Sequence, residues 1–272
     1  RLRTRPRPDR RTQPRRARLK RPRLRFSHFA TRATLTVALV LSAVTVASAS
    51  RAAGFGPVLA DVGGRPAASL ASADSRGTVR FHKPRIRRML IPFGARRRHE
   101  MADYSKRHYG KREWRLKRPR VIVEHYAVAG SVKSIFRTFA PDHPDVELGE
   151  LPNVCSHFAV SSSGRIYQFV PLKKRCRHTV GLNDVAIGIE HVGFSDGDVM
   201  GNRRERRASL KLTRWLRCRF DIRIRNVIGH NESLSSPYHH ERVPSLKNQT
   251  HGDMRPGTMR KYRHLLRKSG RC

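Results

Sequence analysis

Short apolar runs in the second half of the chain have the length and composition of buried β-strands. Residues 121–123, 185–190 and 226–230 are each rich in Val and Ile, and each run ends in a polar residue or is followed by one. Residues 157–170 contain two such runs around a turn at Gly164, which predicts a β-hairpin. The pattern therefore predicts a sheet that begins near residue 120.

Longer segments between these runs have the periodicity of helices. Apolar positions indicate four helices. They cover about 98–109, a segment that begins after Ser131 as its N-cap, 203–220 and about 256–269. Strands that alternate with helices are typical of an α/β fold in which helices pack against a central sheet.

The N-terminal part has the order of charged and apolar residues found in secretory signal peptides. Residues 1–32 are rich in Arg and Pro, residues 35–46 are apolar, and Ala47-Ser48-Ala49 forms a small-residue cleavage site. The apolar run is too short for a stable transmembrane anchor. We expect residues 1–49 to be a signal peptide with a long basic n-region, cleaved near Ala49, and the protein to be secreted or in the cell wall.

Three further segments follow the predicted signal peptide. Residues 50–95 are low in large apolar residues and read as a basic, low-complexity linker. Residues 96–118 read as a basic helical extension, and residues 119–272 as the folded domain. An exported protein folds in an oxidising compartment, so the four cysteines are expected to form disulfides, and we favour Cys155–Cys176 as one pair.

The charge of the chain changes the range of partners to consider. Lys and Arg number 59 against 20 acidic residues, for a net charge of +39, which favours polyanionic partners. Residues 1–50, 51–118 and 119–272 each carry a net +13, so the charge density is highest outside the predicted domain. Aromatic residues make up 7% and no nucleic-acid-binding motif is present, so a specific nucleic acid is not expected. We expect the basic segments to bind anionic cell-wall polymers.

Candidate catalytic residues lie at the ends of the predicted strands. His125, Glu190 and His230 each follow an apolar run, and His251 lies in a polar loop before the last helix. Three imidazoles around an open position, with a carboxylate nearby, are typical of a zinc hydrolase.

Six short motifs follow one another along the chain: VIVEHY at 121–126, CSHF at 155–158, GRIYQFVP at 164–171, RHTVGLN at 177–183, IGIE at 187–190 and VIGHNE at 227–232. Through these motifs, roughly residues 100–270 resemble the zinc-dependent N-acetylmuramoyl-L-alanine amidases of the type-2 amidase and peptidoglycan-recognition superfamily. The resemblance implies a mixed central β-sheet flanked by α-helices. It also implies hydrolysis of the amide bond between N-acetylmuramic acid and L-alanine in bacterial peptidoglycan.

The resemblance assigns roles to individual residues. His125 and His230 match two Zn²⁺ ligands, and His251 is expected to be the third, with Asp253 as the alternative. Glu190 matches the general base.

Other positions match the substrate groove or have no clear counterpart. His178 and Asn183 match a segment that lines the groove, whereas His157 is expected to be structural. The position that is Lys or Thr in many members is Gln249, so Lys247 and His178 are the candidates for stabilising the oxyanion. The competing interpretation is a non-catalytic peptidoglycan-binding protein of the same fold, which the intact ligand set disfavours.

Overall fold

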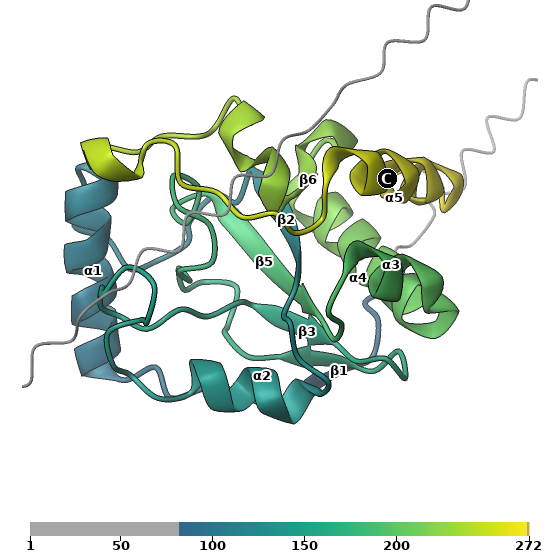
Figure 1. Ribbon diagram of the computed structural model, residues 1–272, viewed down its shortest axis with the longest axis horizontal. Helices are drawn as coiled ribbons and strands as arrows, with labels where there is room; N and C mark the ends of the chain where they lie inside the picture. The colour runs from purple at the N-terminus through teal and green to yellow at the C-terminus, as the bar shows by residue number, and fades with distance from the viewer. Residues whose placement is uncertain (1–81, 271) are drawn as a thin grey trace, which may run out of the picture. The chain divides into compact units, whose positions relative to one another are not determined.

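The computed structural model describes residues 82–270 and Cys272 (Figure 1). The predicted signal peptide and the predicted linker up to residue 81 lie outside the described residues. The helices are α1 (Ala95–Tyr109), α2 (Val132–Phe139), α3 (Asp196–Gly201), α4 (Arg203–Phe220) and α5 (Pro256–Lys268), with 3₁₀ turns η1 (Ile224–Asn226), η2 (His230–Ser235) and η3 (Pro244–Leu246). The strands are β1 (Ile86–Arg88), β2 (Val121–Tyr126), β3 (Phe158–Val160), β4 (Ile166–Gln168), β5 (Ala186–His191) and β6 (Val227–Gly229). Among the described residues, no helix has the length and apolar character needed to cross a bilayer.

The six strands form one mixed sheet in the order β1-β4-β3-β5-β2-β6. Strands β3, β5, β2 and β6 are mutually parallel, whereas β4 runs antiparallel to β3 and parallel to β1. This confirms the expected α/β fold with a mixed central sheet. Parallel strands place their carboxyl ends at one edge, and His125 and Glu190 are paired in register there.

Most of the elements expected from the pattern are present. The hairpin is confirmed as β3 and β4, and Gly164 at its turn has a φ of +79°, a conformation that favours glycine. The Ser131 side chain accepts a hydrogen bond from the backbone N–H of Ser134 and so caps α2, as expected.

The expected linker boundary at residue 95 is wrong, because β1 lies inside the expected linker and forms an edge of the sheet. Its sequence, Ile-Arg-Arg, has no apolar run, and the strand is held by parallel pairing with β4. Strand pairing uses backbone groups that every non-proline residue carries, so side-chain patterning did not reveal it. The folded domain therefore includes residues upstream of the expected extension.

Alternation along the central strands divides the residues between two faces of the sheet. Ile122 and Ile189 pack in the core that contains Leu212 and Leu216 of α4, whereas Val121 and Val123 pack in a separate cluster on the other face. Successive side chains of a strand point to opposite faces. Neighbouring residues of β2 and β5 therefore lie on opposite faces of the sheet, in two different environments.

The helix-covered face carries a buried polar network. The carboxylate of Glu124 lies 3.0 Å from His191 Nε2 and accepts a 2.7 Å hydrogen bond from Thr213 of α4. The Nδ1 atom of His191 is 3.6 Å from the carboxylate of Glu205. Burial alone would lower the pKa of His191, but the two carboxylates outweigh it and raise the pKa to about 9.

This raised pKa predicts a loss of stability in alkaline solution. Protonated His191 stabilises the fold fully below its unfolded pKa of about 6.5, and this stabilisation is lost as the pH rises through about 9. We expect the unfolding free energy to fall by up to about 3 kcal/mol over this range. Urea unfolding at a series of pH values measures it, with His191→Gln as the control. An equally steep fall in His191→Gln would contradict the assignment.

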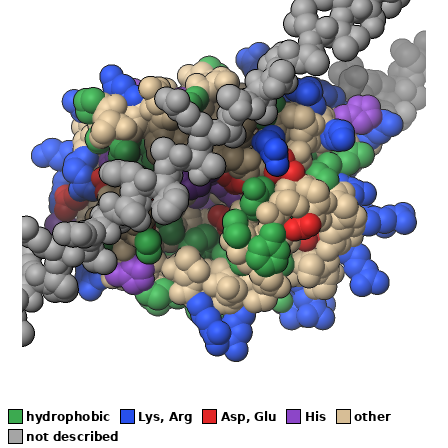
Figure 2. All heavy atoms as spheres, viewed as in Figure 1, with side chains coloured by type: hydrophobic (Ala, Val, Ile, Leu, Met, Phe, Trp, Pro, Cys, Tyr) green, Lys and Arg blue, Asp and Glu red, His purple; other side chains and the backbone are tan. Residues whose placement is uncertain are grey.

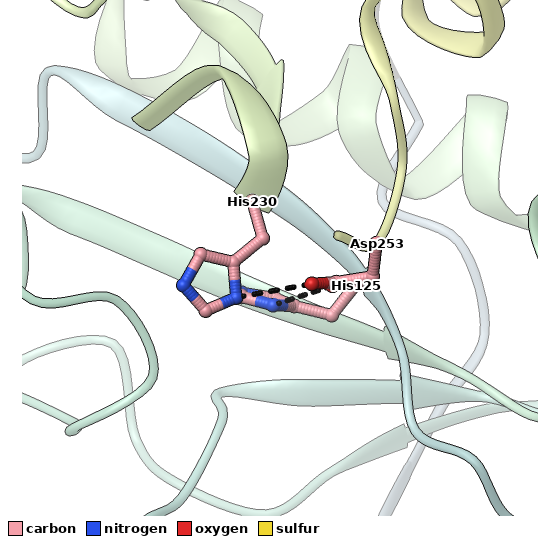
Figure 3. Close-up of side chains that lie close together, drawn as sticks. All are labelled: His125, His230 and Asp253. Atoms are coloured by element: carbon pink, nitrogen blue, oxygen red, sulfur yellow. Dashed lines mark hydrogen bonds and ion pairs between the residues drawn. The ribbon is translucent and has the colours of Figure 1, made fainter. Parts of the chain in front are cut away.

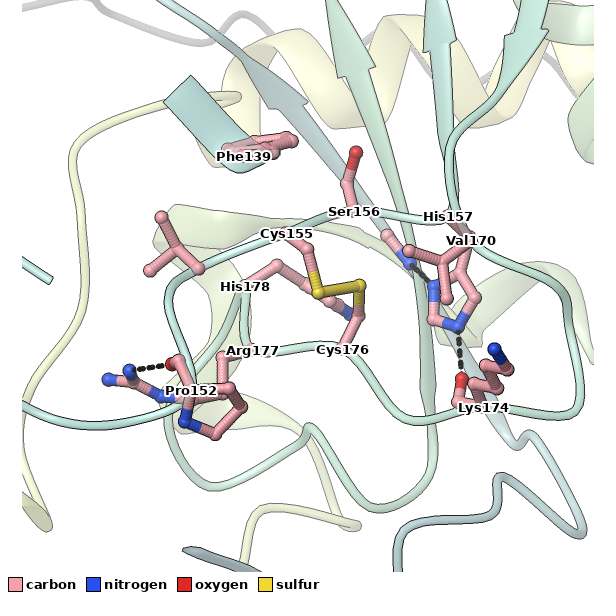
Figure 4. The surroundings of a disulfide bond; sticks show 12 residues. Phe139, Pro152, Cys155, Ser156, His157, Val170, Lys174, Cys176, Arg177 and His178 are labelled. Atoms are coloured by element: carbon pink, nitrogen blue, oxygen red, sulfur yellow. Dashed lines mark hydrogen bonds between the residues drawn. A yellow bond between two sulfur atoms is a disulfide. The ribbon is translucent and has the colours of Figure 1, made fainter. Parts of the chain in front are cut away.

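Two disulfides are present among the described residues, Cys155–Cys176 and Cys218–Cys272. The first confirms the expected pair and joins the segment before β3 to the segment after β4 (Figure 4). Beside it, the His157 ring accepts a hydrogen bond from the Gly188 N–H and donates one to the Lys174 carbonyl. Burial lowers the pKa of His157 to about 4, so the ring is neutral and structural, as expected.

Candidate active site

Two histidines and an aspartate converge at the carboxyl edge of the parallel strands (Figure 3). His125 is the second-last residue of β2, His230 directly follows β6, and Asp253 lies in the loop before α5. His125 Nδ1 is 3.2 Å from one oxygen of Asp253, and His230 Nδ1 is 3.3 Å from the other. One donor atom from each residue lies within 4.8 Å of the others, an arrangement that suits a metal ion.

The loop that carries Asp253 is held in place by contacts far away in sequence. The carboxylate of Asp196 in α3 accepts hydrogen bonds from the backbone N–H groups of Met254 and Arg255, at 2.8 and 2.9 Å. The backbone N–H of Asn231 donates to the Asp253 carbonyl at 3.0 Å. Gly229 permits this close approach, because a Cβ there would overlap the Met254 carbonyl.

His251, the expected third ligand, is not among the converging donors. Its ring stacks on His230 with centroids 4.6 Å apart, and its Nε2 lies 3.0 Å from the Glu147 carboxylate. Its side chain is 42% exposed, whereas that of Asp253 is 10% exposed. The structure thus brings together His125, His230 and the alternative residue Asp253.

The electrostatic environment favours the metal-binding states of Asp253 and His230. Burial alone would lower the pKa of His125, but Glu190 and Asp253 outweigh it and raise that pKa. Burial alone would raise the pKa of Asp253, but its contacts with His125 and His230 hold that pKa well below the ordinary value. Burial lowers the pKa of His230 to about 4. Asp253 is therefore a carboxylate and His230 is neutral, the forms in which these side chains bind metals.

A cavity of about 420 Å³ opens onto this cluster. Apolar side chains form part of its wall, and the wall also includes His178, Arg177 and Glu190. The carboxylate of Glu190 makes no hydrogen bond to the described residues, and burial raises its pKa despite the nearby His125. An unpaired carboxylate with a raised pKa, beside a cluster of metal donors, is suited to proton transfer.

The remaining predicted residues differ in their relation to the cavity. His178 lines it, and its Nδ1 lies 3.2 Å from His125 Nε2. Asn183 is almost fully buried and bonds to the backbone beneath His178. Lys247 is exposed and does not line the cavity, so the structure does not bring it to the cluster.

Sequence reasoning missed Glu147 and Arg177 as parts of the cavity wall. The Arg177 guanidinium donates to the Asp145 carboxylate at 2.8 Å and is almost completely buried. Its place within the motif 177–183 was the available signal, because it directly precedes His178.

A carboxylate and a set of metal donors in one cavity are typical of a metal-dependent hydrolase. The sequence model of a family described as N-acetylmuramoyl-L-alanine amidase matches residues 115–248, just under half of the chain. The enzyme class is therefore that of the amidases. His125, Glu190 and His230 lie within the match, whereas Asp253 and helix α1 lie outside it.

Several solved structures of amidases and endolysins are similar to the chain at low sequence identity. The endolysin N-acetylmuramoyl-L-alanine amidase LysCS from Clostridium intestinale URNW is 16% identical, with a TM-score of 0.44 over 69% of this chain and 98% of that chain. A mutant endolysin from Bacillus subtilis is 18% identical, with a TM-score of 0.40 over 67% and 98%. The amidase AmiD from E. coli, in complex with an anhydro-muramyl peptide substrate, is 22% identical, with a TM-score of 0.34 over 43% and 50%. None of the curated proteins compared with the chain matches it.

Proposed function

We propose that the protein is a secreted zinc amidase that hydrolyses the bond between N-acetylmuramic acid and L-alanine in bacterial peptidoglycan. The observation that carries the proposal is the single cavity shared by the donors of His125, His230 and Asp253 and the free carboxylate of Glu190. Two imidazoles and one carboxylate are a ligand set that catalytic zinc takes in proteins. The match to the amidase family supports the reaction class.

The residues of the chain would share the reaction as follows. A zinc ion bound by His125, His230 and Asp253 would polarise the substrate carbonyl and lower the pKa of water. Glu190 accepts a proton from the water that attacks the carbonyl carbon, and returns it to the nitrogen of L-alanine as the amide bond breaks. The raised pKa of Glu190 favours this second, acidic role.

The charge that develops on the carbonyl oxygen requires stabilisation by a nearby group. Of the two residues expected to help, His178 lines the cavity and Lys247 does not. We therefore assign this supporting role to His178. The apolar part of the wall, with Val128 at its mouth, provides a surface for the methyl groups of a muramyl peptide.

Export and wall binding complete the proposal. The signal-like segment 1–49 and the two disulfides support secretion, because disulfides persist in oxidising compartments. Lys and Arg side chains surround the face shown in Figure 2, and we propose that they attract anionic polymers of the cell wall.

Digestion of purified peptidoglycan tests the function. We expect release of stem peptides with a free L-alanine amine, detected by mass spectrometry, and loss of this release after chelation and its recovery with Zn²⁺. Binding to the same walls should weaken with added salt, because salt screens the attraction. Wall binding without any peptide release would favour the non-catalytic alternative.

A further inference from the structure

Helix α1 lies upstream of the matched family segment, yet it contacts the loops that form the cavity. Its buried His108 lies 3.0 Å from the Glu150 carboxylate and 2.9 Å from that of Glu241. Its buried Arg97 donates to the Phe139 carbonyl at the end of α2, at 2.9 Å. The helix therefore ties together three segments, and the segments of Phe139 and Glu150 contribute residues to the cavity wall.

Hydrogen bonds connect α1 to His178 in the cavity wall through the side chain of Asn183. The Oδ1 atom of Asn183 accepts hydrogen bonds from the backbone N–H groups of both His178 and Thr179, each at 2.8 Å. The Nδ2 atom points the other way and donates to the hydroxyl of Tyr104 in α1, at 3.0 Å. The Tyr109 hydroxyl accepts from the backbone N–H of Asn183 at 3.2 Å.

This arrangement leaves the Asn183 amide with one favourable orientation. Tyr104 is fully buried and Asn183 is 1% exposed, so water does not replace a lost partner. The two backbone N–H groups can only donate, so they fix the Oδ1 end of the amide toward His178. The Tyr104 hydroxyl gives the buried Nδ2 atom a partner, and the loss of that partner would be unfavourable. Tyr104 itself is held by stacking on His108, with ring centroids 3.8 Å apart.

The His178 ring has little freedom on its other sides. A Cβ added at Gly188 of β5 would lie 2.8 Å from two ring atoms of His178, so the ring packs directly on that strand. Its Nδ1 contacts Thr179 Oγ1 at 2.9 Å and His125 Nε2 at 3.2 Å. A shift of the 178–179 backbone would therefore move the ring against His125.

We propose that Tyr104 is a positioning residue, which sets His178 beside the catalytic cluster through the amide of Asn183. This inference rests on the proposed amidase activity. It makes α1 a part of the active-site framework. In this proposal the substrate touches neither Tyr104 nor Asn183. Loss of the Tyr104 hydroxyl should therefore lower the turnover rate and leave substrate binding intact.

The test compares Tyr104→Phe with Tyr167→Phe in the full-length, zinc-loaded protein. Both changes remove one hydroxyl and keep the ring, and the Tyr167 hydroxyl makes no hydrogen bond to the described residues. We expect Tyr104→Phe to lower kcat about tenfold, as for other residues that orient active-site groups, and to leave KM within about twofold. Zinc content should be unchanged, and Tyr167→Phe should behave as wild type.

A second readout does not depend on activity. The imidazole NMR signals of His178, assigned with His178→Gln, should shift in Tyr104→Phe and in Asn183→Ala, and stay in place in Tyr167→Phe. The double variant should show about the same kcat as Asn183→Ala alone, because both changes break one chain of contacts.

The outcomes separate the inference from the function. A wild-type protein that releases no stem peptide would refute the amidase proposal, and the His178 signals would still decide the role of Tyr104. Unchanged His178 signals in a folded Tyr104→Phe protein, or additive effects in the double variant, would overturn the inference.

Discussion

Replacement of Glu190 by Ala should abolish nearly all turnover while the protein keeps its zinc. Glu190 is the cavity carboxylate that makes no hydrogen bond to the described residues, and burial raises its pKa. Without it, no side chain accepts the proton of the attacking water or supplies one to the departing amine. We expect a loss of about 10³-fold in kcat, within the usual range for a general acid–base group.

The control for this result is Glu147→Ala. Glu147 also lines the cavity, but its side chain is 54% exposed and contacts His251 and Gln249. Its loss should lower kcat far less than the loss of Glu190, because an exposed side chain outside the reacting groups takes no part in the proton transfer. Release of stem peptides and elemental analysis of zinc measure the two properties separately. A Glu190→Ala protein that retains zinc and full activity would refute the base assignment.

The second large effect concerns the proposed third zinc ligand, Asp253. Asp253→Ala should lose stoichiometric zinc, because both oxygens of Asp253 face the Nδ1 atoms of the two histidines. Loss of a direct ligand should weaken zinc binding by more than about hundredfold, beyond the effect of losing an outer contact. Activity should fall with the zinc.

His251→Ala provides the matched comparison in the same loop. It removes a stacked and partly exposed ring that is not among the converging donors. We expect its zinc content to remain stoichiometric after dialysis, by elemental analysis. The reverse pattern, with zinc lost in His251→Ala and kept in Asp253→Ala, would restore the ligand set first expected from the sequence.

Local patterning was enough to find most of the elements and two of the three converging donors. Helix α4 has the bounds 203–220 expected from its periodicity, and His125 and His230 follow from apolar runs. A strand end gives a side chain a defined position, since the sheet fixes the backbone there. Where an element carries its own apolar pattern, the sequence of that element is informative.

The third donor depends on contacts that no local pattern contains. The loop at residue 253 is held by the hydrogen bond from the Met254 N–H to Asp196, which is 58 residues away in sequence. The loop can also approach Gly229 closely, because glycine has no side chain. His251 and Asp253 are two residues apart in an irregular segment, so spacing does not decide which one faces the cluster. The link from Tyr104 to Asn183 spans 79 residues and is hidden for the same reason.

The alternation in β2 and β5 has a consequence for the evolution of this chain. Glu124 and His125, and likewise Glu190 and His191, are neighbours in sequence that face opposite sides of the sheet. Deleting one residue within either strand would exchange a member of the reaction centre with a member of the buried network. Both strands should therefore tolerate substitutions at some positions but no change in length.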